Sequence, residues 1–381
     1  MKLHEINVQK FRCIENMRLS FENALGQVQP VTVLVGPNGC GKTSVLFAIV
    51  QALRGIMGYR TDDVPEPAEL DIFRSGNGEG FTRTRPRVSV TLHVEFDSSE
   101  LQAIPQVFED TMYLHNEPRP SAIGNGRVTV DWKYPPSLRS DGTPLPTWYV
   151  DRLMPRHALP WFKGRLYAIR GWRDQKLSRL SLLDEIGGPM LFPQDRNLKT
   201  RVTGASIAQG EAEESRAEEN VYGRSREKTV WEILKYLGQL AADGGGIIGG
   251  METWEGRIKE QFNRICAPKE YLGFLYHPND PQGSPYFKDG ASTYSLSVAS
   301  SGEQVILEYI TRMTYPSPMN HSLVLIDEPE VHLHPGWVRQ LYHALPSIGQ
   351  DNQFILTTHS SEMRELAVQD GVHIDLGDLQ R

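Results

Sequence analysis

The sequence predicts an α/β fold of the P-loop NTPase class, and three observations indicate it. Residues 36–43 read GPNGCGKT, which matches the phosphate-binding pattern G-x-x-x-x-G-K-[ST]. The apolar run 31–35 precedes this string and a helical pattern follows it from Ser44, so the motif has the strand–loop–helix context that it requires. A second apolar run, 323–326, ends in two carboxylates, as expected for a buried strand of a parallel sheet whose carboxyl end carries a site.

The glycine-rich string predicts contacts with the phosphates of ATP. Glycine lets backbone N–H groups curl around a phosphate, and the N-terminus of the following helix adds positive potential. Lys42 is expected to reach the β- and γ-phosphates, and the hydroxyl of Thr43 is a candidate ligand of Mg²⁺. The predicted nucleotide contacts are Asn38, Gly39, Cys40, Gly41, Lys42, Thr43 and Ser44. The sequence therefore predicts ATP and Mg²⁺ as cofactors.

Two strand ends near the C-terminus carry the residues expected to act on the γ-phosphate. Asp327 suits the Mg²⁺ shell, and Glu328 suits the group that orients or activates the attacking water. The apolar run 353–358 predicts another buried strand, which delivers His359 to the same edge of the sheet. We therefore expect these three side chains to lie close to the phosphate loop.

The chain resembles ABC-class ATPases of the SMC/RecF/OLD branch, a group that includes ATPase subunits of bacterial antiphage systems of the Septu- or retron-associated type. The resemblance rests on the phosphate loop, on residues 300–304 (SSGEQ) and on residues 327–335 (DEPEVHLHP), and it covers roughly the first 55 and the last 90 residues. It implies that Ser300, Ser301, Gly302 and Glu303 form a signature motif that contacts nucleotide. It further implies a Walker B role for Asp327 and Glu328 and a switch role for His359.

Two further site residues follow from position within this family pattern. Residues 11–14 resemble an N-terminal element whose arginine approaches the nucleotide, so Arg12 is a candidate phosphate contact or else a solvated strand-end arginine. Residues 191–196 lie where related ATPases carry a glutamine loop. Gln194 is therefore a candidate for the Mg²⁺ and water shell and Arg196 for a phosphate or interface contact, with a plain surface turn as the alternative.

The resemblance predicts one ABC-type P-loop NTPase head over residues 1–381, with a β-rich lobe, a mainly parallel sheet lobe and a helical insertion. We expect a nucleotide-binding core at 1–60 and 290–381, a β-rich lobe with connecting elements at 61–200, and a helical or flexible insertion at 201–290. Alternating or apolar patterns predict strands at 2–10, 88–96, 127–134 and 165–170, and helical spacing predicts helices at 229–242 and 254–265.

Composition is typical of a cytoplasmic enzyme. The three cysteines, Cys13, Cys40 and Cys266, form no C-x-x-C pair, which excludes a disulfide framework and an ordinary zinc finger. No run of apolar residues is long enough to span a membrane. The net charge of −7 argues against a dedicated nucleic-acid coat protein. A basic stretch at 163–179, with two aromatic residues, predicts either a DNA- or RNA-binding groove or a solvated face.

Taken together, these patterns predict an ATPase that dimerises around ATP. The middle of the chain lacks the sustained heptads of a long coiled-coil arm, and the segment after His359 is too short for the nuclease domain of OLD-type proteins. We therefore expect a homodimer that regulates a separately encoded effector, a nuclease or toxin, in antiviral defence. The alternative is a RecF-like DNA maintenance ATPase that binds DNA and loads partners.

Overall fold

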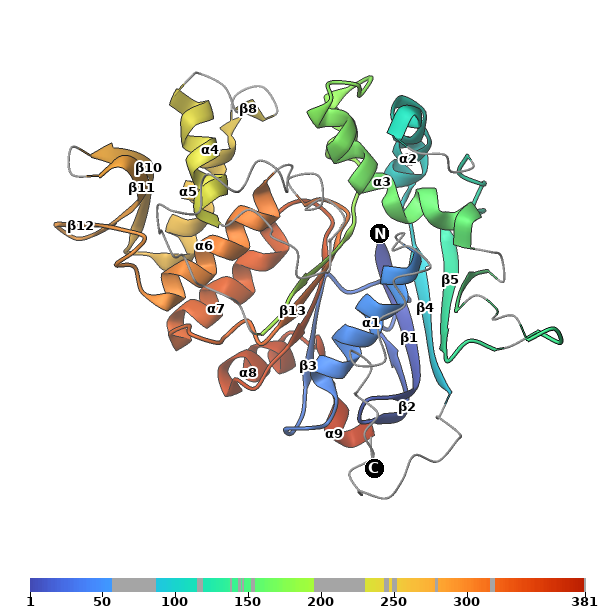
Figure 1. The fold of residues 1–381 in the computed structure, drawn as a ribbon. Coiled ribbons are helices and arrows are strands. Elements are labelled where there is room, and N and C mark those ends of the chain that lie inside the picture. Colours follow the sequence, from blue (N-terminus) through green and yellow to red (C-terminus); the bar gives the residue numbers. More distant parts are fainter. Residues whose placement is uncertain are drawn as a thin grey trace.

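Two five-stranded sheets, one parallel and one antiparallel, make up the body of the structure (Figure 1). The computed structural model describes residues 1–56, 87–114, 119–137, 139–142, 145, 147–151, 155–194, 230–242, 247–248, 252–277, 280–315 and 319–379. In this part of the chain every helix is too short or too polar to cross a membrane.

The parallel sheet carries the C-terminal segments and has the strand order β15-β3-β14-β13-β7. Its strands are β3 (Val31–Val35), β7 (Pro189–Phe192), β13 (Leu323–Asp327), β14 (Gln353–Thr357) and β15 (His373–Asp375). Strands β3, β13 and β14 are buried along their whole length, because both faces of the sheet are covered. Along β13, Leu323 and Leu325 enter one core cluster, whereas Val324 and Ile326 enter the other.

Helices cover the parallel sheet on both sides (Figure 1). Helix α1 (Lys42–Ile56) lies between this sheet and the antiparallel sheet and contacts strands of both. The helices associated with the C-terminal half are α5 (Trp254–Cys266), α6 (Ser301–Thr314), α7 (Pro335–Ala344), α8 (Ser361–Gln369) and α9 (Leu376–Leu379), with a 3-10 turn at Leu345–Ser347. The carboxyl ends of β3, β13 and β14 therefore run directly into the segments that carry the predicted site.

The antiparallel sheet has the order β2-β1-β4-β5-β6. Its strands are β1 (Lys2–Phe11), β2 (Ile14–Ser20), β4 (Val88–Glu95), β5 (Arg127–Tyr134) and β6 (Trp148–Val150). Every second residue of β4 is buried, which matches the alternation that predicted it and leaves one face towards solvent. The helices of this lobe are α2 (Ser98–Asp110) and α3 (Pro155–Arg173), with 3-10 turns at Met112–Leu114 and Leu180–Leu183.

The structure corrects the sequence prediction in the middle of the chain. Residues 165–170 were expected to form a strand but lie within α3, because the buried apolar residues of this helix recur at helical spacing: Ala158, Trp161, Phe162, Tyr167 and Ala168. The expected division at residue 60 does not follow the sheets either. Strand β1 belongs to the antiparallel sheet, and β7 pairs with β13 at the edge of the parallel sheet.

The segment expected to be a helical insertion also contains strands. Its described elements are α4 (Val230–Ala242), β8 (Ile247–Ile248), β9 (Glu252–Thr253), α5, β10 (Glu270–His277) and β11 (Asp280–Asp289), and β10 and β11 form a three-stranded antiparallel sheet with β12 (Ser292–Ser295). The glutamate-rich stretch around Glu211–Glu219 and the candidate contact Arg196 lie outside the described residues.

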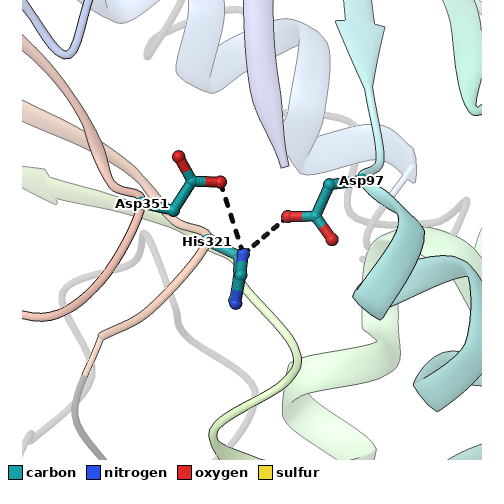
Figure 2. A group of neighbouring side chains, drawn as sticks. All are labelled: Asp97, His321 and Asp351. Atoms are coloured by element: carbon teal, nitrogen blue, oxygen red, sulfur yellow. Dashed lines mark ion pairs between the residues drawn. The ribbon is translucent and has the colours of Figure 1, made fainter.

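A polar cluster joins the two sheets at the end opposite the predicted site. His321 precedes β13, Asp351 precedes β14 and Asp97 caps α2, and Figure 2 shows the two carboxylates on either side of the imidazole. His321 Nδ1 lies 2.5 Å from Asp97 Oδ2 and 3.6 Å from Asp351 Oδ2. Two ligand atoms of one tetrahedral zinc ion lie about 3.3 Å apart when each metal–ligand bond is about 2.0 Å. The distance of 2.5 Å between His321 and Asp97 is too short for two such ligands. We therefore describe this cluster as an ion-paired contact between lobes.

Electrostatics in this cluster favour a charged His321 and an ionised Asp97. The ion-pair contact with Asp97 raises the pKa of His321, although burial opposes this. Burial disfavours ionisation of Asp97, but hydrogen bonds with His321 and Ser99 hold its pKa well below the ordinary value. Stability from His321 is thus fully present below about pH 6.5 and is lost as pH rises through its raised pKa. Stability from Asp97 is present above about pH 4 and is lost as pH falls through its depressed pKa.

Substitution of His321 by asparagine should therefore lower the free energy of unfolding more at pH 5.5 than at pH 9. Asparagine tolerates the left-handed backbone at this position, where φ is 52°, so the change isolates the ion pair. We expect a loss of about 1 kcal/mol at pH 5.5, because both side chains are partly exposed. Asp97→Asn keeps an N-cap residue on α2 and should show the same pH dependence in urea unfolding. Equal losses at both pH values would contradict the assignment.

Candidate nucleotide-binding site

The phosphate loop connects β3 to α1 at the carboxyl edge of the parallel sheet. Helix α1 begins at Lys42, and the three glycines of the loop have positive φ values of 144° at Gly36, 79° at Gly39 and 98° at Gly41. At Gly36 a Cβ atom would also lie 2.8 Å from Cys40 Sγ. The sequence therefore needs glycine here for both conformation and space, as the phosphate-binding pattern implies.

Lys42 is held inside this loop by backbone carbonyls. Its Nζ donates hydrogen bonds to Gly36 O at 2.9 Å and to Pro37 O at 3.2 Å, and the residue is 4% exposed. Asn38 and Gly39 are exposed at the tip of the loop, whereas Cys40, Gly41 and Ser44 are buried. The exposed tip and the buried ammonium lie on one short turn, which is the arrangement that a phosphate-binding loop requires.

Thr43 and Asp327 meet across 284 residues of sequence. Thr43 Oγ1 donates to Asp327 Oδ1 at 2.9 Å, and Thr357 Oγ1 donates to the same oxygen at 2.5 Å. Adjacent ligands in a Mg²⁺ octahedron stand about 2.9 Å apart when metal–oxygen bonds are about 2.05 Å. The hydroxyl and carboxylate thus have the identity and the separation of two Mg²⁺ ligands.

Glu328 lies at the centre of a second cluster beside this pair. Gln194 Nε2 donates to Glu328 Oε2 at 2.8 Å, and His359 Nε2 lies 3.4 Å from Glu328 Oε1. The backbone of Glu328 has a φ of 48° and its N–H donates to Thr357 Oγ1 at 3.0 Å. The structure therefore brings together Gln194, Glu328 and His359, which the sequence proposed from three separate segments.

Burial raises the pKa of the Glu328 carboxyl. His359 opposes this shift, whereas Glu330 and Asp327 add to it because they carry like charge. A carboxyl whose pKa is raised accepts a proton more readily than an ordinary glutamate, and this suits a group that orients water and takes up a proton.

Arg12 lies in the turn between β1 and β2 and is half-buried. Its guanidinium stacks 4.2 Å from the centroid of the Phe47 ring on α1, and its Nε is buried without a hydrogen-bond partner among the described residues. Burial lowers the pKa of Arg12, while the nearby charges of Cys13 and Asp327 oppose the shift. Arg12 is thus half-buried against α1 and is not a fully solvated strand-end arginine.

The predicted signature motif forms the N-terminus of α6. Ser300 is the N-cap, its Oγ accepts from Glu303 N, and both Ser300 and Ser301 are exposed. Gly302 is buried against the next loop, where a Cβ atom would lie 2.8 Å from His332 O and 3.2 Å from Trp337 Cζ3. An open helix N-terminus with two exposed hydroxyls is suited to an anion.

Glu303 was expected to contact nucleotide, but in this structure its carboxylate is buried and bonded within the chain. The residue is 1% exposed, and its carboxylate accepts from Ser300 N at 2.7 Å, from the Tyr294 hydroxyl and from Lys269 Nζ at 3.3 Å. It completes a capping box and therefore points into the protein. Serine three residues before glutamate was a signal for this box in the sequence, whereas Tyr294 and Lys269 carried none.

Family models match both halves of the nucleotide-binding region. Residues 1–106 match the model described as AAA ATPase domain, and residues 268–364 match the model described as AAA domain, putative AbiEii toxin, Type IV TA system. The chain is 38% identical over 404 aligned positions to the retron Ec83 probable ATPase of Escherichia coli, an alignment that covers 95% of this chain and 69% of that protein.

Solved structures with a similar fold are SMC head domains. The SMC head bound to the C-terminal winged-helix domain of ScpA has a TM-score of 0.52 at 13% identity, covering 96% of this chain and 92% of that one. The SMC head with an extended coiled coil, bound to the C-terminal domain of ScpA from Pyrococcus furiosus, has a TM-score of 0.49 at 14% identity, covering 95% and 91%. The first of these likenesses supports an α/β P-loop ATPase fold.

Proposed function

Because this chain belongs to the SMC/RecF-like AAA ATPases of antiphage-type systems, we propose that it hydrolyses ATP as a homodimer and regulates a separately encoded effector. The observation that carries the hydrolytic part is the contact of Glu328 with Gln194 and His359 beside the Thr43–Asp327 pair. These groups converge from four separate segments, and packing alone does not require them to meet.

In the proposed mechanism each group has one task. Lys42 and the loop amides bind the β- and γ-phosphates, and Thr43 and Asp327 would hold Mg²⁺, which would neutralise charge on the phosphate oxygens. Glu328 orients the attacking water and accepts its proton, while Gln194 fixes the carboxylate by donating to Oε2. His359 lies on the opposite oxygen of Glu328, where it is placed to contact the γ-phosphate.

We assign the second half of each site to another copy of the chain. Ser300 and Ser301 are exposed at the start of α6, and no described hydrogen bond or ion pair joins them to residues 36–44. In the proposed dimer these hydroxyls and amides cap the phosphates held by the partner, and closure excludes water from the γ-phosphate. Hydrolysis removes the shared anion and opens the dimer, so ATP acts as a switch.

Two observations support the role in effector control: the name of the relative, and the contacts that the basic stretch at 163–179 makes within the chain. The relative is a retron ATPase by name. The basic stretch at 163–179 was expected to form either a nucleic-acid groove or a solvated face, and Arg165 donates to Ile186 O inside the lobe while Arg179 pairs with Glu185 at 2.9 Å. Two cations of the stretch therefore make contacts within the chain, which counts against a DNA groove built on Arg165 and Arg179.

The isolated chain is expected to hydrolyse ATP slowly and to leave DNA and RNA uncut. A neighbouring effector should bind through the segment 201–290, and deletion of residues 211–219, which lie outside the described residues, should weaken effector control more than nucleotide binding. The measurements are a nuclease assay with Mg²⁺ or Mn²⁺ and an effector pull-down with both proteins. Nucleic-acid cleavage without a partner that disappears in Lys42→Ala would instead make this chain the effector.

A further inference from the structure

We propose that Glu330 is a positioning residue that holds His359 at its distance from Glu328, an inference that rests on the proposed hydrolytic function. Glu330 lies two residues after Glu328 in the loop that follows β13, whereas His359 follows β14. The two strands are adjacent and parallel, with Asp327 opposite Thr357. Any group that links the two loops therefore determines how the water-orienting carboxylate and the histidine face each other.

Glu330 makes this link through a single oxygen. Its Oε1 accepts from Thr358 Oγ1 at 2.7 Å, from His359 N at 2.7 Å and from Ser360 N at 3.0 Å. Ser360 is the N-cap of α8, so the carboxylate also lies at the positive end of that helix. Hydrogen bonds to a charged acceptor are shorter and stronger than those to a neutral acceptor. Three donors of the loop after β14 make such bonds to this one oxygen of Glu330.

The side chain of His359 needs such support from its backbone. It is 38% exposed, and its ion-pair contact among the described residues is with Glu328 at 3.4 Å. Thr357 makes the reciprocal link, since its Oγ1 accepts from Glu328 N at 3.0 Å. The end of β14 thus positions Glu328, and the loop after β13 positions His359. With both links in place, neither loop can shift without moving the other.

The three hydrogen bonds also explain why position 330 carries a carboxylate, although Glu328 lies only two residues away. Two glutamates in one short loop repel each other, and a residue needed only for packing would avoid that repulsion. The loop itself is held by a turn in which Val331 N donates to Glu328 O and Leu333 N donates to Glu330 O. Glu330 is therefore presented rigidly, and the three donors of the neighbouring loop offset the repulsion.

Glutamine is the matched rescue at this position. The second oxygen, Oε2, is buried and accepts no hydrogen bond among the described residues. The carbonyl oxygen of glutamine can take the place of Oε1 and receive the same three donors, while its amide occupies the place of Oε2. Alanine removes the acceptor altogether. Glu362→Ala is the matched control, because Glu362 lies in the first turn of α8, the helix that Ser360 caps, but pairs with Arg339 at the surface.

The first test is steady-state ATP hydrolysis by the full chain. Glu330→Ala should lower kcat about tenfold and leave KM and the Kd for ATP within about twofold, because the affected step follows binding. Glu330→Gln should restore kcat to within about threefold of wild type, and Glu362→Ala should behave as wild type. In the His359→Ala background, Glu330→Ala should cause no further loss, since it acts through His359. An additive loss in the double variant, or a change in KM alone, would overturn the proposal.

The second test does not need activity. Hydrogen–deuterium exchange at the His359 and Ser360 amides should speed up about tenfold in Glu330→Ala and stay near wild type in Glu330→Gln. The Thr358 amide donates to Leu34 O and should remain protected in every variant, which controls for unfolding. Unchanged exchange at 359–360 in the alanine variant would refute the positioning role. If the exchange rates change as expected but the wild-type chain does not hydrolyse ATP, the proposed function is refuted and the positioning role stands.

Discussion

Replacement of Glu328 by glutamine should preserve ATP binding and lower the rate of hydrolysis at least about a hundredfold. Glutamine keeps the size of the side chain and can still contact Gln194, but it cannot take a proton from the attacking water. The measurement is phosphate release under saturating ATP, beside equilibrium binding of ATP to the same protein. Because the dimer opens only after hydrolysis in the proposed mechanism, this variant should also accumulate as an ATP-bound dimer.

Lys42→Ala provides the contrasting variant for that experiment. Its ammonium is the charged group inside the phosphate loop, so its loss should abolish binding itself. The two variants thus separate capture of the nucleotide from chemistry on it. Wild-type turnover in purified Glu328→Gln protein would remove Glu328 from the hydrolytic role, and another group would have to orient the water.

Substitution of Ser300 by arginine should leave ATP binding by the single chain nearly intact while preventing dimer closure. Arginine adds bulk at the exposed start of α6 and removes the oxygen that caps the helix. Loss of an N-cap alone destabilises by about 1 kcal/mol, which is too little to unfold the protein. Closure is measured by size-exclusion chromatography with ATP in a Glu328→Gln background, where hydrolysis does not reopen the dimer.

A mixing experiment tests whether the two half-sites belong to different copies. Lys42→Ala protein lacks a functional phosphate loop but keeps its signature segment, and Ser300→Arg protein has the opposite defect. Their heterodimer should contain one competent composite site and recover part of the activity. Absence of recovered activity, with exchange of subunits confirmed, would contradict the shared site.

Several elements were predictable because their signals are local. The strand at 31–35, the phosphate loop and the helix after it follow from an apolar run, fixed glycines and an amphipathic pattern. The strands at 323–327 and 353–357 are buried on both faces and read as continuous apolar runs. The strand predicted at residues 165–170 was wrong because a short apolar run is shared by buried strands and buried helix segments, and the rest of α3 decides between them.

The sequence by itself determined the P-loop fold class and proposed the candidate site residues, because each depends on residue type within one short segment. Only the tertiary structure decided which side chains meet. Gln194 reaches Glu328 across 134 residues because β7 pairs with β13 at the sheet edge, and Glu303 turns inward because Tyr294 and Lys269 supply donors there. The link from Glu330 to His359 likewise depends on two strands being neighbours. Strand order is set by packing of the whole chain, so no local pattern reports it.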